Sequence, residues 1–219
     1  MSGSVAPTPH LAPQFDDIDQ QREADRLGMW VFLSTEILLF GGLFLSYTVY
    51  RCLYPRAFLL GSEQTDFWLG TINTAVLLLS SLTMVMAVHA AQEGKQKPLI
   101  ALLLLTMTLG AAFLGIKFYE YYLDYGKHLV PSLNFAYKSG EPPAVQLFFL
   151  MYFFMTGLHA VHLTIGISIV GVMTALAWKK RLSAQNHMPI EITGLYWHLV
   201  DIVWVFLYPL LYLIGQQHQ

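Results

Sequence analysis

The sequence predicts an all-α membrane protein, a bundle of five transmembrane helices, from its composition and its apolar runs. Hydrophobic residues make up 55% of the 219 residues and charged residues 12%, about half of the roughly 25% found in soluble domains. A spanning helix needs about 20 mostly apolar residues, and such runs occur at 28–50, 67–91, 98–123, 144–178 and 192–214. Helix-length runs without polar alternation exclude a membrane β-barrel.

Each predicted span has its own boundary signals. An acidic arm rich in Pro, Ser and Ala precedes the first span, and its lack of a charged n-region argues against a cleavable signal peptide. Pro98 suits the start of the third span, and Pro142 and Pro143 that of the fourth, because a missing N–H costs nothing in the first turn of a helix. We expect an N-terminal arm, disordered and amphipathic, at 1–27, a single transmembrane domain at 28–215 and a short tail at 216–219.

Lysine and arginine are unevenly shared between the two sides of the predicted bundle. One side carries Arg22, Arg26, Lys95, Lys97, Lys179, Lys180 and Arg181, and the other Arg51, Arg56, Lys127 and Lys138. Because positive charge is retained on the cytoplasmic side, we expect the N-terminus to be cytoplasmic and, after five crossings, the C-terminus to lie outside. The segment 124–141 is then the largest external loop.

Composition also excludes several functional classes. The formal net charge is −2, and no basic stripe accompanies the short cluster at 179–181, so a nucleic-acid partner is not expected. Cys52 is the single cysteine, and the chain therefore forms no intrachain disulfide, thiolate zinc site or iron–sulfur cluster.

Polar side chains within the spans are the candidate functional residues. They are Glu36, Asn73, His89, Lys117, Glu120, His159, His162, His198 and Asp201. Glu36 is the only ionisable residue of the first span, and an acidic residue at that depth costs roughly 2.5–3.5 kcal/mol. Counting about 1.5 Å per residue from the predicted ends places His159 and His198 near its level, so we expect Glu36 to hydrogen-bond one of them. For Lys117 and Glu120 we expect an anchoring ion pair in wet surroundings.

Three interpretations of Glu36 stay open: a structural carboxyl that holds helices in register, a proton-handling carboxylate, and a metal ligand. Metal ligation is the weakest, because the spacing of His159 and His162 is accompanied by neither a Glu-x-x-His motif nor a cysteine. A haem between histidines is a fourth alternative, although only His159 and His198 are reasonably embedded. A transporter ranks last, because no inverted repeat is visible.

Several motifs together resemble subunit III of haem-copper oxidases of the cytochrome c oxidase type. They are 27–44 (LGMWVFLSTEILLFGGLF), 156–166 (TGLHAVHLTIG), 196–212 (YWHLVDIVWVFLYPLLY), the segment around Asn73 (TINTAVLLLSS) and the cluster at 119–121. All occur in the family's order on successive spans. The resemblance implies the five-helix bacterial form, which lacks the first two helices of the seven-helix relatives.

The resemblance implies an accessory subunit with no catalytic, cofactor-binding or metal-binding residue of its own. Haem and copper are expected in subunit I, the catalytic partner that contacts this chain, reduces oxygen to water and pumps protons in aerobic electron transport. The implied role is to stabilise that subunit and support proton uptake. Other oxidase subunits, a respiratory supercomplex and membrane lipids are further expected partners, in the bacterial cytoplasmic (inner) membrane as a multi-pass protein.

The family's intramembrane polar positions are matched by Glu36, Asn73, Glu120, His159, His162, His198 and Asp201. Glu36 matches the family's carbodiimide-reactive acid. A bound phospholipid is left open, because the lipid-holding cleft of the seven-helix relatives needs the two helices that are absent here. Two alternatives also remain: the subunit III homologue of nitric oxide reductases, and a haem-binding membrane cytochrome subunit.

Overall fold

The computed structural model describes residues 13–131, 135, 142–180, 182, 187–213 and 215, and these residues form helices without strands. The helices are α1 (Ile18–Leu53), α2 (Pro55–Ser62), α3 (Phe67–Gln92), α4 (Gln96–Gly126), α5 (Pro142–Trp178) and α6 (Met188–Tyr212). Five of these helices, all except α2, are long and apolar enough to cross a membrane. The predicted all-α fold with five spans is therefore confirmed, and α2 is an addition that the sequence analysis did not predict.

Local capping explains several helix boundaries. The Asp17 carboxylate accepts a hydrogen bond from the Gln20 backbone N–H at 2.6 Å and starts α1 well before Gly28. Residues 18–27, predicted as part of the arm, thus continue the first helix. Asp66 caps α3 in the same way. Outside the described residues lie 1–12 of the arm, the tail 216–219, half of the predicted external loop (132–134 and 136–141, which include Lys138) and Arg181.

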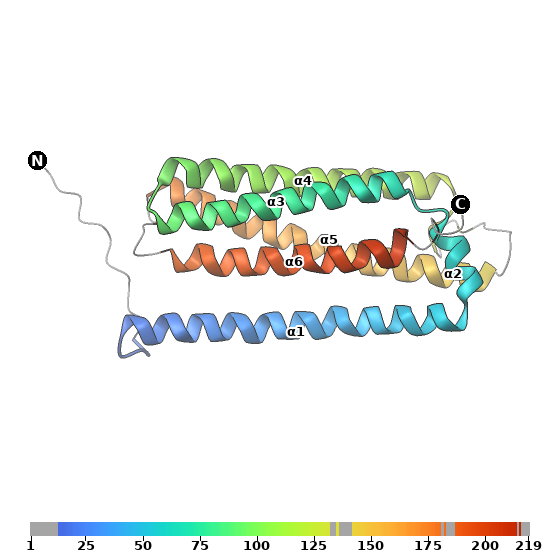
Figure 1. Ribbon diagram of the computed structural model, residues 1–219, viewed down its shortest axis with the longest axis horizontal. Helices are drawn as coiled ribbons and strands as arrows, with labels where there is room; N and C mark the ends of the chain where they lie inside the picture. The colour runs from blue at the N-terminus through green and yellow to red at the C-terminus, as the bar shows by residue number, and fades with distance from the viewer. Residues whose placement is uncertain are drawn as a thin grey trace, which may run out of the picture.

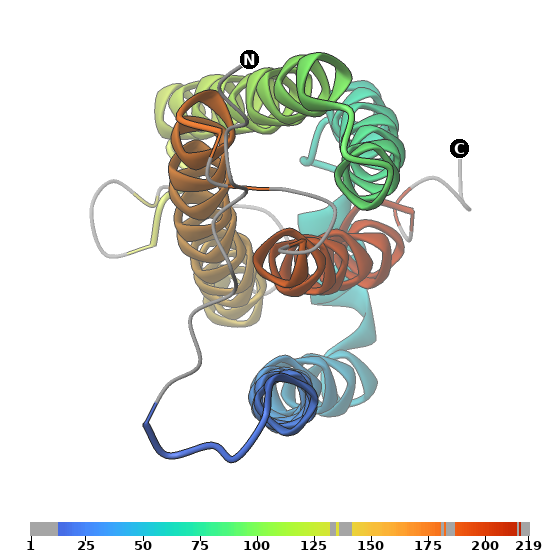
Figure 2. The same ribbon diagram turned by 90° about the vertical axis from the view of Figure 1, so that its left-hand side faces the viewer.

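The helices α3 to α6 form one group, and α1 runs alongside it (Figures 1 and 2). The buried residues of α1 are Leu33, Phe40 and Tyr47, which recur every seven positions on one stripe. In the most apolar 18-residue stretch of α1, only 11% of the residues are buried, whereas 61% are buried in the corresponding stretch of α6. The rest of α1 therefore presents apolar side chains outward.

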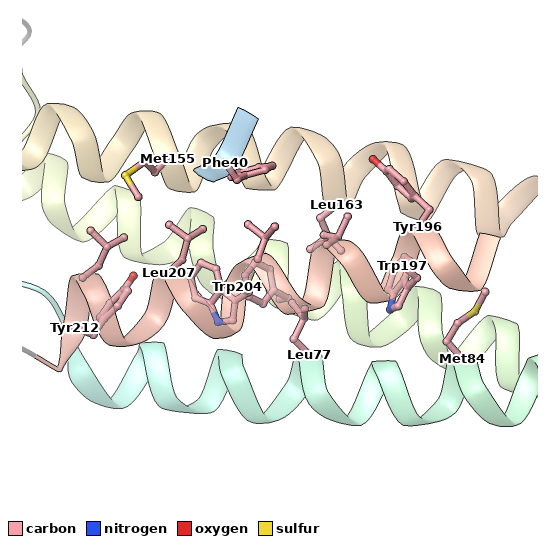
Figure 3. Close-up of a cluster of buried hydrophobic side chains, with 14 of the residues drawn as sticks. Phe40, Leu77, Met84, Met155, Leu163, Tyr196, Trp197, Trp204, Leu207 and Tyr212 are labelled. Carbon is pink, nitrogen blue, oxygen red and sulfur yellow. The ribbon is translucent and has the colours of Figure 1, made fainter. Parts of the chain in front are cut away.

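The core is built around α6. Trp197 and Trp204 are fully buried between α6 and its neighbours (Figure 3). Each indole N–H finds a hydroxyl on α3: Trp197 donates to Ser80 at 3.2 Å and Trp204 donates to Thr74 at 3.0 Å. These bonds satisfy the polar edges of two large apolar side chains and set the register of α3 against α6.

The short helix α2 closes the end of the bundle at which α1 ends. Its Phe58 ring is fully buried and meets Tyr47 and Phe148 at centroid distances of 5.2 and 5.6 Å. The Ser62 hydroxyl donates to the Leu211 carbonyl at 2.8 Å. At eight residues, α2 is too short to cross a membrane, so the search for apolar runs of spanning length did not predict it.

Candidate functional site

Glu36 contacts a histidine of α5, and this pair attaches α1 to the bundle. Glu36 Oε2 lies 2.9 Å from His162 Nε2, and the two side chains are 15% and 14% exposed. The Phe40 ring meets the imidazole edge-on at a centroid distance of 5.2 Å. A further polar attachment of α1 is the Tyr47 hydroxyl, which donates to the Leu210 carbonyl at 2.7 Å.

The other ring nitrogen of His162 determines how the pair holds its proton. Nδ1 lies 2.8 Å from the Leu158 carbonyl oxygen. Because a carbonyl oxygen only accepts, Nδ1 carries a hydrogen. In a neutral imidazole Nε2 then accepts from a protonated Glu36, and in the charged pair Nε2 donates to the carboxylate. Either way, Glu36 and His162 share one proton along this bond.

The predicted partners of Glu36 lie elsewhere, so that prediction is wrong. His159 is fully buried between Phe113 and Trp204, at centroid distances of 5.5 and 5.1 Å. Neither of its ring nitrogens has a hydrogen-bond partner within the described part of the chain. His198 is bound to a serine of α3 instead.

Two physical facts explain the error over the partner of Glu36. The depth of Glu36 was counted from Gly28, whereas α1 begins at Ile18, so the carboxyl sits about 27 Å along its helix at 1.5 Å per residue. Depth also says nothing about direction around a helix axis. His162 faces α1, and His159 turns toward α4 and α6.

A pocket of about 330 Å³ opens beside the Glu36–His162 pair, between α1, α5 and α6. Its other lining residues are Met29, Phe32, Ile165, Ile169, Ile192, Thr193 and Tyr196. The Tyr196 hydroxyl donates to the His162 carbonyl at 3.0 Å and steadies this wall. The carboxyl of Glu36 therefore borders a mostly apolar space.

His198 and Asp201 are three residues apart on one face of α6, and both lie beside Ser81 of α3. His198 Nδ1 lies 2.8 Å from Ser81 Oγ. Asp201 is 4% exposed, and neither carboxyl oxygen has a hydrogen-bond partner among the residues that the structure describes. Ser81 is the polar neighbour of Asp201 as well, although that contact does not reach hydrogen-bond geometry.

Lys117 and Glu120 form a buried ion pair, which corrects the predicted wet anchoring pair. Both side chains are 2% exposed, and Lys117 Nζ lies 2.9 Å from Glu120 Oε2. Lys117 also donates to the hydroxyls of Tyr152, at 3.0 Å, and Tyr212. These hydroxyls donate to Glu120 Oε1 at 2.8 and 2.7 Å. Although Lys117 and Glu120 lie near the end of α4, water does not surround them, because both side chains face the bundle interior.

The sequence analysis missed three members of this buried cluster: Tyr152, Tyr212 and Asp124. Asp124 is buried on α4 four residues beyond Glu120, and the positions 117, 120 and 124 share one helix face, a usable signal. The rings of Tyr152 and Tyr212 lie 4.7 and 5.1 Å from Lys117 Nζ. Cation–π attraction thus adds to the hydrogen bonds around the ammonium.

Asn73 is fully buried on α3, and both atoms of its amide lack a partner within the described residues. No group of three or more His, Cys, Asp or Glu side chains that could hold a metal occurs in the described ranges. The spacing of His159 and His162 does not make a ligand pair either, because the two rings have different neighbours.

Comparison with known proteins places the chain in a family. The sequence model described as cytochrome c oxidase subunit III matches residues 19–216. The chain belongs to the cytochrome c oxidase subunit III family. It is 35% identical to quinol oxidase subunit 3 of Bacillus spizizenii, over 90% of this chain and 92% of that protein. It is 31% identical to cytochrome bo(3) ubiquinol oxidase subunit 3 of Pseudomonas aeruginosa, over 86% and 84%.

Membership of the subunit III family confirms the resemblance seen in the sequence and places the chain in an oxidase complex. The two relatives are named quinol oxidases, whereas the sequence analysis expected the cytochrome c oxidase type. Among the seven family-matched polar residues, the structure joins Glu36 to His162 and places Glu120 in the lysine cluster. It keeps His159 and His198 apart from Glu36.

Proposed function

We propose that this chain is the accessory subunit III of a bacterial terminal oxidase of the haem-copper type, one that oxidises a quinol and reduces oxygen to water. The observation that carries the proposal is the family match over residues 19–216. Relatives that align over most of both chains are named quinol oxidase subunit 3. Those names support a quinol as the electron donor, in place of the cytochrome c type expected from the sequence.

The proposed role of the subunit is to stabilise the catalytic subunit and to support proton uptake, with haem and copper held by that partner. The paired polar groups support this role. The Glu36–His162 contact joins α1 to α5. Lys117, paired with Glu120 on α4, donates to tyrosines of α5 and α6, so these polar groups hold helices together within the chain. The bare outer face of α1 offers an apolar surface for lipid or another subunit. We place the chain in the bacterial cytoplasmic membrane with its N-terminus in the cytoplasm.

Purification through a tag on this chain tests the assignment. We expect a large subunit with the visible spectrum of a haem-copper centre to co-purify, and the complex to oxidise a quinol faster than reduced cytochrome c. A partner with haem and non-haem iron would instead select the nitric oxide reductase alternative. A Soret band that stays with the isolated chain would contradict the accessory role and favour a haem-binding subunit.

The stabilising role is tested by Glu36→Ala in the purified complex. This change removes the carboxyl that attaches α1 to α5, so we expect assembly and the initial rate of quinol oxidation to be nearly unchanged. The rate should then decay several-fold faster during sustained turnover. Ser34→Ala is the matched control, because Ser34 lies on α1 and its hydroxyl bonds only its own helix, at the Trp30 carbonyl. Equal decay in wild type and Glu36→Ala would refute the role.

A further inference from the structure

A second pocket, of about 490 Å³, lies between α3 and α6 at the end of the bundle where α6 begins. Its lining residues are Val85, Val88, His89, Gln92, Glu191, Gly194, Leu195 and His198. The pocket extends from Glu191, in the first turn of α6, to His198, about 10 Å further along at 1.5 Å per residue. It therefore reaches from the bundle end toward the interior.

Histidine, glutamate and glutamine side chains surround the mouth of this pocket. Gln92 Nε2 donates to Glu191 Oε1 at 2.7 Å, and His187 Nε2 lies 3.2 Å from the same carboxylate oxygen. On α3, His89 is exposed and its Nε2 lies 3.6 Å from Glu93 Oε1. The mouth is therefore lined by imidazole and carboxylate groups that reach solvent.

The inner end of the pocket leads to a carboxyl that is unsatisfied. His198 lines the pocket and is bound through Nδ1 to Ser81 Oγ at 2.8 Å. Asp201 follows one turn deeper on the same face, beside Ser81, with both oxygens lacking a partner within the described residues. The buried ammonium of Lys117, on α4, is engaged by Glu120.

The buried carboxyl of Asp201 needs a hydrogen-bond partner that the neighbouring side chains of the described residues do not supply. An ionised carboxylate without a counter-charge is very costly in a buried site, so the carboxyl is held in its neutral form. Its hydroxyl then needs an acceptor, and buried polar groups without protein partners are usually satisfied by ordered water. Glu120 shows the contrast, because two tyrosine hydroxyls and Lys117 saturate its carboxylate.

We propose that the pocket between α3 and α6 is a water-filled inlet through which Asp201 exchanges its proton with the aqueous phase at this end of the bundle. The proton of the Asp201 carboxyl passes to a water of the inlet, which gives one of its own protons to Ser81 Oγ, while the Ser81 hydroxyl proton passes to His198 Nδ1. A second water in the pocket takes the Nε2 proton of the imidazolium. On return, water protonates Nε2 and the Nδ1 proton restores the Ser81 hydroxyl. The first water, which exchanges with bulk water, then returns either of its protons to Asp201, so no net charge remains and no redox partner is needed.

This inlet goes beyond the proposed function, because the exchange depends on the residues of this chain alone. It also differs from the Glu36–His162 pair, which borders another pocket on the other side of α6. Infrared spectroscopy of the intact complex in lipid nanodiscs tests it. The C=O stretch of the Asp201 carboxyl is the band that Asp201→Asn removes, and its isotope shift is followed after transfer to D2O.

We expect this band to shift in wild type well before the core amides exchange. Val85→Phe narrows the pocket and Ser81→Ala interrupts the relay, and each should slow the shift at least ten-fold. Val172→Phe, at a similarly exposed valine of α5 that does not line the pocket, is the matched control and should exchange like wild type.

Three results would overturn the inlet. The first is an Asp201 band that shifts no faster than the core amides, and the second is a shift in Val85→Phe and Ser81→Ala as fast as in wild type. The third is the absence of any protonated carboxyl band that Asp201→Asn removes, because the carboxyl would then be ionised. Asp201→Asn keeps the shape of the side chain, and Asp201→Glu, which keeps a carboxyl but shifts its C=O band, assigns the band if the asparagine fails to assemble.

Discussion

Replacing Lys117 by methionine should destabilise this protein far more than the loss of an exposed lysine. The change keeps an unbranched side chain of similar length but deletes the ammonium, which donates to Glu120, Tyr152 and Tyr212. Removing one partner of a buried ion pair typically costs about 3–5 kcal/mol. Glu120 keeps two tyrosine donors, so we place Lys117→Met at about 3 kcal/mol, the lower end of that range.

The reciprocal change should cost more. Glu120→Gln leaves the ammonium of Lys117 buried with tyrosine hydroxyls, ring faces and the more distant carboxyl of Asp124 but without its direct ion-pair partner, so we expect about 4 kcal/mol. Replacing both residues removes the whole ion pair, and neutral substitutes of similar volume are often tolerated. The double variant should therefore lose only about 2 kcal/mol, less than either single variant.

Pulse proteolysis of the purified complex across an SDS titration measures these losses, because the band of this subunit can be followed separately on a gel. Lys97→Met is the control: Lys97 is exposed at the start of the same helix, and its loss should stay within about 0.5 kcal/mol. A Lys117→Met variant as stable as this control, or a double variant whose loss equals the sum of the singles, would refute the reasoning.

Three further predictions concern attachment, packing and orientation. Tyr47→Phe removes a buried hydrogen bond to a carbonyl of α6 and should lower the unfolding free energy of the subunit, read by the same proteolysis, by about 1 kcal/mol. Gly61→Ala places a Cβ closer to the Phe148 ring than van der Waals contact allows and should cost about 1–3 kcal/mol. Gly28→Ala, with open space around it, should be neutral, and equal effects would contradict this packing. Cys52 is exposed, so a membrane-impermeant thiol reagent should label it from the outside of intact cells whose outer envelope has been removed. Labelling of Cys52 in inverted vesicles alone would reverse the predicted orientation.

The predictable parts of the fold are those that depend on local sequence. Apolar runs of spanning length indicated five helices, and the structure has five such helices near the predicted ranges. The start of α1 was misplaced, because the Asp17 cap lies in a polar segment that hydropathy alone excludes from a span. The short α2 was missed for a related reason, since its eight residues are too few to register as a run.

The candidate site was predictable in its members but not in its pairings. Glu36, Glu120, His162 and Asp201 were identified as polar residues that are costly in a membrane, and all four are largely shielded. Which of them meet depends on rotation about each helix axis. His159 and His162 lie about one turn apart on α5 and point in different directions, so Glu36 contacts His162 and not His159.

The sequence by itself determined the membrane class, the spans, the family and the set of polar residues, because helix formation and membrane insertion depend on the chain's own hydropathy and backbone hydrogen bonds. Only the tertiary structure decided that Lys117 is buried among tyrosines, that α1 lies at the side of the bundle, and that Asp201, near a pocket, has no hydrogen-bond partner among the described residues. These features arise from contacts between helices far apart in the chain, and spacing along one helix does not specify its neighbours.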